Sequence, residues 1–350
     1  MTRRLLTGLL VLPMLVAACH DDGGSSAGEG ASVDATVAAA ADAIVDRYRD
    51  LSEGLAALVD AIDALCDTPT NTALHDVRTA WSPADLAWRA SRAGGIGPAM
   101  SRRLDASLGF LARPASVERL IDGTDPVDAD SIEEAGAAVK GFSALELALF
   151  GAGSDALATA AGARRCAYAS GVATLAQRQA DQVLQDWTGR YRGELTADLD
   201  GQEALGMLVN ELSHRLTELD DQGLRSLTEA RALDDLSANR LDGPAAFHLA
   251  ELRGQLDGAA TLLRGPDGTG GLVALLVGKD VDLSHRLDHA TTDAVDALAA
   301  LPDSVSQAFR DRAAVADAQQ KVAALKVLVA TEVASELGVT ISFSDADGDS

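Results

Sequence analysis

One carboxylate of this 350-residue chain stands inside a strongly apolar segment. Glu146 lies within Ala144–Leu149, where every other residue is Ala or Leu, so a helix there would place its carboxylate against other helices. A buried carboxylate has to be ion-paired, metal-bound or protonated. We expect first an ion pair with an arginine, such as Arg240 or Arg89, that locks two parts of the chain together. A metal-binding or ligand-binding role is the second possibility, and simple exposure is the third.

Two histidine–acid pairs also have a spacing that could hold a metal ion. Glu211 and His214 are three residues apart, as are His248 and Glu251, so each pair would share one face of a helix. Carboxylate-bridged iron bundles use the order Glu-x-x-His. A chain this rich in acidic residues produces several such pairs by chance, so a solvated helix face is the alternative for both.

The amino terminus is typical of a secreted, lipid-anchored protein. Two arginines precede an apolar run that is too short to span a bilayer, which predicts a signal peptide over residues 1–18. The segment Val16–Cys19 resembles a lipobox, which implies cleavage before Cys19 and lipidation of its thiol. Residues 19–33 would form a flexible polar tether. Because His20, and not Asp, follows Cys19, we expect the anchor in the outer membrane, facing the periplasm.

Two further cysteines remain once Cys19 carries lipid. An even pair in an oxidising compartment favours a disulfide between Cys66 and Cys166. The alternative is two buried free thiols, since cysteine also packs as a small apolar residue.

Composition favours an all-α protein and excludes one class of partner. Aromatic residues make up only 3% of the chain while hydrophobic residues make up 47%, which is enough for a large helical core. The 53 acidic and 29 basic residues give a net charge of −24. Such a charge repels phosphate backbones, so nucleic acid is excluded as a partner.

The periodicity predicts two helical-bundle halves. From Val37 to Leu65 apolar residues recur at alternating spacings of four and three, the pattern of a helix in a bundle. We expect an amino-terminal half over residues 34–190 and a carboxy-terminal half over 200–350 that ends in an acidic tail. Within the first half we expect helices near 71–92, 130–150, with a kink at Gly141, and 155–188. In the second we expect them near 202–230, 244–264, 281–300 and 303–336.

Several short motifs, taken in order, resemble the imelysin-like lipoprotein family. The motifs are Gly141 with Ser143, Ala144, Leu145 and Glu146; Leu65-Cys66; Trp81; Trp88; Gly97-Pro98; Arg165-Cys166-Ala167-Tyr168; Trp187; and the ending Ser344-Asp345-Ala346-Asp347-Gly348-Asp349. The resemblance implies four-helix-bundle-related domains with the Glu146 motif near their junction. Gly141, Trp81, Trp88, Gly97, Pro98 and Arg240 would then be structural residues around that motif.

The same resemblance implies a role in bacterial iron uptake. Imelysins carry Gly-x-His-x-x-Glu where this chain has Gly141 to Glu146, so Ser143 replaces a histidine and a metal site built as in imelysins would lack a ligand. The candidate metal or ligand residues are therefore Glu146, Ser143, His248 and Glu251, with a divalent metal or iron as the possible cofactor and no catalytic residue assigned. We expect a non-enzymatic periplasmic accessory protein that works with an iron-uptake partner. The alternatives are a helical scaffold that binds a protein partner without metal and, less in keeping with the residues, a metallopeptidase.

Overall fold

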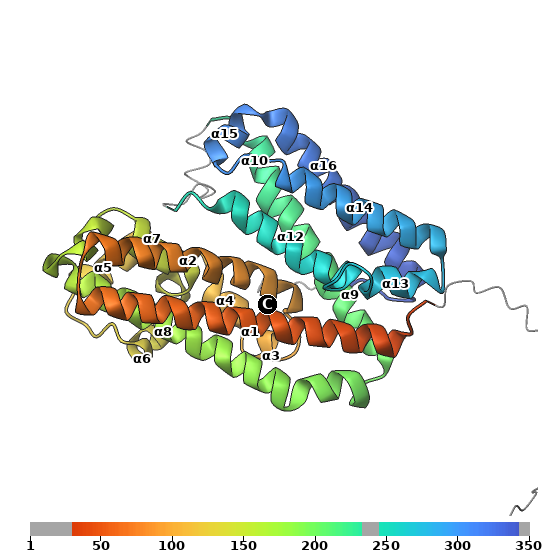
Figure 1. Cartoon of the computed structure of the whole chain (residues 1–350), viewed down its shortest axis with the longest axis horizontal. Helices are drawn as coiled ribbons and strands as arrows, with labels where there is room; N and C mark the ends of the chain where they lie inside the picture. Colours follow the sequence, from red (N-terminus) through yellow and green to blue (C-terminus); the bar gives the residue numbers. More distant parts are fainter. Residues whose placement is uncertain (1–29, 233–244, 343–350) are drawn as a thin grey trace, which may run out of the picture.

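The computed structural model describes residues 30–232 and 245–342, and these residues form helices and connecting turns without a β-strand (Figure 1). The α-helices of the first half are α1 (Val33–Asp67), α2 (Asn71–Ser91), α3 (Pro98–Ser101), α4 (Leu104–Leu108), α5 (Pro114–Asp122), α6 (Ala129–Glu134), α7 (Phe142–Phe150) and α8 (Ala163–Asp186). Those that follow are α9 (Gly201–Glu218), α10 (Arg225–Glu229), α12 (His248–Arg264), α13 (Gly271–Val277), α14 (Val281–Ala299), α15 (Val305–Arg310), α16 (Arg312–Leu328) and α17 (Ala334–Glu336).

Short 3₁₀ and π segments join or extend these helices. The 3₁₀ segments are η1 (Arg92–Gly94), η2 (Ala137–Val139), η3 (Ser154–Ala158) and η4 (Ala160–Gly162). The π-helical segments are η5 (Trp187–Tyr191), η6 (Glu194–Asp198), η7 (Leu219–Leu224) and η8 (Val329–Val333). The all-α prediction is confirmed. The assigned boundary of the two halves near residues 190–200 stays a prediction; here η5 and η6 prolong α8 as far as Asp198.

The first group of helices is organised by α1, which packs against both α2 and α8 (Figure 1). Ser32 caps α1 by accepting a hydrogen bond from the amide of Ala35 at 3.2 Å. The apolar residues that the sequence placed along this helix, from Val37 to Leu65, are all buried. A disulfide joins Cys66 at the end of α1 to Cys166 on α8, with 5.6 Å between their Cα atoms, so the predicted bridge is confirmed.

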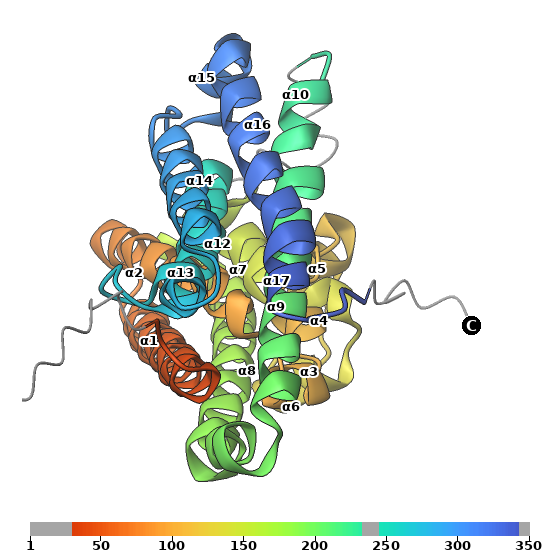
Figure 2. The same cartoon turned by 90° about the vertical axis from the view of Figure 1, so that its right-hand side faces the viewer.

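The second group consists of α12, α14 and α16, which pack in succession, with α9 against α12 and α16 (Figure 2). Its main contact with the first group is α2 against α12, while α9 contacts α1 and η1. Buried apolar side chains form one cluster that runs through both groups. None of the described helices combines the length and apolar content that a membrane span requires.

Three of the expected helices are interrupted in the structure. The prediction of one helix over 130–150 with a kink at Gly141 is wrong. The segment forms α6, η2 and α7, and Gly141 (φ 78°) is the residue just before α7. A Cβ at Gly141 would lie 2.5 Å from the carbonyl oxygen of Leu108, so only glycine fits this close approach. The segment before Ala163 is 3₁₀-helical, and the helix expected over 303–336 divides at Asp311.

Candidate functional site

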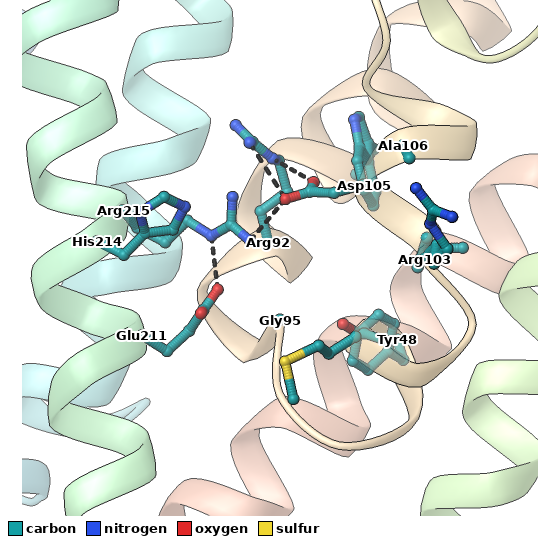
Figure 3. Close-up of a pocket in the computed structure, with 13 residues that line it drawn as sticks. Tyr48, Arg92, Gly95, Arg103, Asp105, Ala106, Glu211, His214 and Arg215 are labelled. Carbon is teal, nitrogen blue, oxygen red and sulfur yellow. Dashed lines mark hydrogen bonds and ion pairs between the residues drawn. The ribbon is translucent and has the colours of Figure 1, made fainter. Parts of the chain in front are cut away.

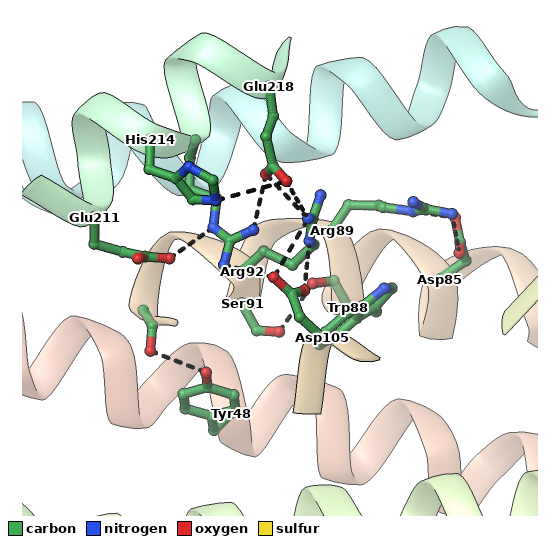
Figure 4. A network of polar contacts seen from close by, with 12 residues as sticks. Tyr48, Asp85, Trp88, Arg89, Ser91, Arg92, Asp105, Glu211, His214 and Glu218 are labelled. Carbon is green, nitrogen blue, oxygen red and sulfur yellow. Dashed lines mark hydrogen bonds and ion pairs between the residues drawn. The ribbon is translucent and has the colours of Figure 1, made fainter. Parts of the chain in front are cut away.

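Three charged residues on α2 and η1 lie where the two groups of helices meet. Asp85, Arg89 and Arg92 are four and three residues apart, so the helix places them on one side. α2 contacts α12 and η1 contacts α9, which brings acidic residues of both partner helices to these arginines; Figure 4 shows those of α9, Glu211 and Glu218. Two ion-pair clusters result, one around Arg89 and one around Arg215.

The Arg89 cluster consists of Asp85, Arg89, His248 and Glu251. Arg89 Nη2 lies 3.2 Å from Asp85 Oδ1 and 2.9 Å from Glu251 Oε1, so one guanidinium serves a carboxylate of each group of helices. His248 Nδ1 lies 3.6 Å from the second oxygen of Glu251. Asp85 is fully buried, and the side chains of Arg89 and Glu251 are nearly so. This cluster therefore ties α2 to α12 at a largely buried site.

The two carboxylates of this cluster have opposite pKa shifts. Burial raises the pKa of Asp85 to about 7, and the attraction of Arg89 only partly offsets it. Oδ1 of Asp85 accepts no hydrogen bond from the described residues, which adds to the cost of ionising it. At Glu251 burial also raises the pKa, but Arg89 and His248 together lower it below its usual value. Near neutral pH the cluster thus holds one full carboxylate and one that is partly protonated.

Glu146 and Ser143 of α7 make contacts to the backbone. Glu146 Oε1 accepts a hydrogen bond from the amide of Ala245 at 3.0 Å, just before α12 begins. Its negative charge also raises the pKa values of Asp85 and Arg89, so it lies within electrostatic reach of the Arg89 cluster. Ser143 Oγ accepts a hydrogen bond from the amide of Ala112 at 3.2 Å. The motif therefore fastens α7 to the loop after α4 and to the start of α12.

These residues do not fit a metal ion as a donor set. Among residues 30–232 and 245–342, no three His, Cys, Asp or Glu side chains converge in a way that could hold one. Arg89 already supplies positive charge to Asp85 and Glu251, and a cation would have to displace its guanidinium. A metal or ligand role for Glu146, Ser143, His248 and Glu251 stays a prediction.

The Arg215 cluster consists of Arg92, Asp105, Glu211, Arg215 and Glu218. Arg215 pairs with Glu211 at 2.6 Å, Asp105 at 2.6 Å and Glu218 at 2.8 Å, one carboxylate for each of its nitrogens. Arg92 pairs with Asp105 at 2.9 Å and Glu218 at 3.0 Å. Two guanidiniums are therefore shared among three carboxylates, and they join η1 and α4 to α9.

The two arginines decide the acidity of this second cluster. Burial alone would raise the pKa of Asp105, but Arg92 and Arg215 outweigh it and lower the pKa to about 2. The same balance lowers the pKa of Glu218 below its usual value. Asp105 and Glu218 are therefore negative at neutral pH.

A cavity of about 350 Å³ opens beside the Arg215 cluster (Figure 3). Glu211, His214 and Arg215 line it from α9, while Arg103 lines it from the turn before α4 and Asp105 from α4 itself. Tyr48 lies in its floor and donates its hydroxyl to the carbonyl of Gly94 at 2.9 Å. A neighbouring groove of about 600 Å³ shares Met100, Glu211 and His214 with this cavity. Both groups of helices thus contribute to one hollow.

The predicted structural residues lie close to these clusters. Trp81 packs edge to face against Phe150 and Phe247, which brings α7 and the start of α12 together. Trp88 stacks on Phe142 with 6.3 Å between ring centroids. Gly97 (φ 54°) precedes Pro98, the first residue of α3, and a Cβ at Gly97 would overlap the ring of Tyr191. Two predicted residues, Cys19 and Arg240, lie outside the described residues.

The family of the chain follows from its overall sequence. The Imelysin family model matches residues 44–331, which is most of the chain and includes both clusters. This chain belongs to the imelysin family. No curated protein matches it.

Solved structures agree with the fold of this imelysin-family protein. An imelysin-like protein from Psychrobacter arcticum 273-4 is similar with a TM-score of 0.71 and 20% identity, over 90% of this chain and 100% of that one. A structure described as an iron-regulated protein A precursor from Parabacteroides distasonis ATCC 8503 has a TM-score of 0.73 and 17% identity, over 89% of this chain and 97% of that one. At these identities the likeness concerns the fold.

Sequence reasoning identified only part of the site of this imelysin-family protein. Arg89, Glu211, His214, His248 and Glu251 were named as candidates, and the structure brings His248 and Glu251 to Arg89 and the other two to the cavity. The further charged residues Asp85, Arg92, Arg103, Asp105, Arg215 and Glu218 were missed. A usable signal existed, because the charges at 85, 89 and 92 adjoin the apolar side of α2 that carries Trp81 and Trp88.

Proposed function

We propose that this imelysin-family protein is a non-enzymatic binding protein of the bacterial envelope that assists iron uptake. The observation that carries the proposal is the cavity beside the Arg215 cluster, since both groups of helices line it and its charges are held in place. Ligand sites commonly lie between packed helices and between domains. The link with iron is supported by the family and by the name of the Parabacteroides neighbour.

The contacts of the family motif favour binding over hydrolysis. A metallopeptidase needs a metal with an open coordination position and a general base beside it. Here the hydroxyl of Ser143 and one oxygen of Glu146 accept backbone hydrogen bonds. The carboxylates of Asp85 and Glu251 face Arg89. The described groups at the motif are thus engaged in joining helices.

We further propose that the protein is anchored by lipid at Cys19, on the periplasmic side of the outer membrane. The sequence of residues 1–19 supports this, as does the word precursor in the name of the Parabacteroides neighbour. Incorporation of labelled palmitate that is lost in Cys19→Ser checks the anchor, and fractionation of the membranes checks its location.

The test of the proposed function fills the cavity and measures growth. Ala106 is exposed on α4 and lines the cavity, so Ala106→Trp should block the site at little cost in stability. The matched control is Ala316→Trp, at an exposed position of α16 far along the chain. In a deletion strain under iron limitation, the wild type and Ala316→Trp should restore growth, and Ala106→Trp should not.

Two results would contradict the proposal. Full complementation by Ala106→Trp would show that the cavity is not the working site. Peptide hydrolysis by the purified protein that is lost in Glu146→Gln would favour the metallopeptidase. Elemental analysis of protein purified without chelator also tests the fit of metal, and we expect no stoichiometric ion.

A further inference from the structure

The charges around the cavity are almost completely matched within the protein. Each nitrogen of Arg215 already faces a carboxylate, and Arg92 is paired with Asp105 and Glu218. A ligand that recruited either guanidinium would leave a partly buried carboxylate without its partner, which is costly. The Arg215 cluster is therefore a wall of the cavity and not its anchoring group.

Arg103 is different from the arginines of that cluster. It lines the cavity, its side chain is exposed, and no hydrogen bond or ion pair joins its guanidinium to the described residues. Its neighbour Arg102 points elsewhere and is engaged, with Nε 2.6 Å from Asp186 and Nη1 2.9 Å from Gln182 on α8. Arg102 thus binds α8, whereas Arg103 lies at the cavity, where Figure 3 shows it.

The backbone of Arg103 is in the left-handed region, with φ 54° and ψ 42°. For a residue with a Cβ this conformation costs roughly 1–2 kcal/mol, and such strain often marks a functional position. The left-handed residue ends α3 and turns the chain into α4. It thus places the guanidinium at the cavity, opposite the helix face that carries Glu211 and His214.

The sum of charges limits the ligand to a single negative charge. Arg92, Arg103 and Arg215 carry three formal positive charges, and Asp105, Glu211 and Glu218 carry three formal negative ones, so these six residues sum to zero. A ligand with one carboxylate would supply an ion pair for Arg103, and the occupied site would then have a net charge of −1. A phosphate dianion would leave two, within a protein of net charge −24.

We propose that this cavity binds a small monocarboxylate with an apolar body, and that Arg103 holds the carboxylate. Guanidinium and carboxylate match in a bidentate pair. Met100 is exposed and offers apolar surface for the rest of the ligand, and the buried side chains of Leu104 and Trp88 form part of the cavity wall. The volume of about 350 Å³ is at the small end of ligand sites, so the ligand is small, and a longer body would extend into the groove past His214. This inference names the ligand class of the proposed function and rests on it.

The test compares acids with their neutral isosteres on the full-length protein. Calorimetry or ligand-observed NMR would measure hexanoate and benzoate, the amides of both, and phenyl phosphate. We expect the two carboxylates to bind best. Arg103→Met should weaken their binding by about ten- to a hundredfold, the usual value of a charge-assisted hydrogen bond. Because Arg103 has no partner to lose, the melting temperature of Arg103→Met should match the wild type.

Arg102→Met is the matched control, since it removes the adjacent arginine that faces α8. It should leave carboxylate binding unchanged. Equal binding of acids and amides, no carboxylate binding at millimolar concentration, or equal losses in Arg102→Met and Arg103→Met would overturn the ligand class. The proposed function would survive that result if Ala106→Trp still failed to restore growth. Conversely, carboxylate binding lost in Arg103→Met together with full growth of Ala106→Trp would refute the iron-linked function alone.

Discussion

The two ion-pair clusters follow one another along α2 and η1, and their aspartates, Asp85 and Asp105, have opposite pKa shifts. In the Arg89 cluster a single guanidinium forms ion pairs with both Asp85 and Glu251. Asp85 is fully buried there, and its pKa rises to about 7. In the Arg215 cluster two guanidiniums converge on Asp105, which is 40% exposed, and its pKa falls to about 2. For these two aspartates, the number of guanidiniums that face the carboxylate and its exposure to solvent decide whether the pKa rises or falls.

This difference indicates different roles for the two clusters, one structural and one at a ligand site. The Arg89 cluster is largely buried and joins α2 to α12, so we assign it to the junction of the helices. The Arg215 cluster borders a cavity and keeps its charges at neutral pH, so it can shape a ligand site. Arg103, beside this second cluster, lines the cavity with a guanidinium that pairs with none of the described side chains.

The largest effect is expected from removing the shared guanidinium. Arg89→Met leaves Asp85 and Glu251 buried without a counter-charge, which typically costs about 3–5 kcal/mol of unfolding free energy. Urea unfolding followed by circular dichroism measures it. The control is Arg286→Met, where the exposed pair with Glu332 should contribute less than about 1 kcal/mol. Equal losses in both variants would show that the Arg89 cluster does not hold the junction.

An intermediate effect is expected at the cavity. Asp105→Asn removes a charge that both Arg92 and Arg215 face, and we expect a loss of about 1–3 kcal/mol at neutral pH, reduced by the exposure of the side chain. The depressed pKa adds stability at pH above 3.8, and that stability is lost as the pH falls toward about 2. In the variant this acid-side dependence should weaken. Asp293→Asn, at the exposed pair with Lys321, is the control.

The smallest effect is expected from Asp85→Asn at pH 5. Because the folded state raises the pKa of Asp85 from 3.8 to about 7, this group favours folding at low pH and loses that contribution as the pH rises through 7. The amide resembles the protonated acid, so we expect less than about 1 kcal/mol of change at pH 5. Stability measured from pH 4 to 8 should decline less steeply in the variant. An unchanged slope would mean that Asp85 ionises normally in the folded protein.

The sequence determined most of the secondary structure and the covalent framework. The buried face of α1 was predicted because helical periodicity is a local property: the spacing of the apolar residues alone shows which side of the helix they share. The pair Cys66 and Cys166 was predicted because two cysteines remain once Cys19 is taken as the lipid site, in a chain that we expect to be secreted. The division at Gly141 was missed, because the close approach of the Leu108 carbonyl that requires glycine comes from a separate segment.

Only the tertiary structure decided which charges meet. Arg89 and Glu251 are 162 positions apart, and Arg92 and Glu218 are 126 apart, so no spacing rule connects them. Each ion pair depends on how α2 and η1 pack against α12 and α9, and burial, which sets the pKa values, depends on the same packing. The sequence determined the charged residues and the helix faces on which they lie. The packing of helices that are distant in the chain placed the Arg89 cluster at a buried junction and the Arg215 cluster in the wall of a cavity.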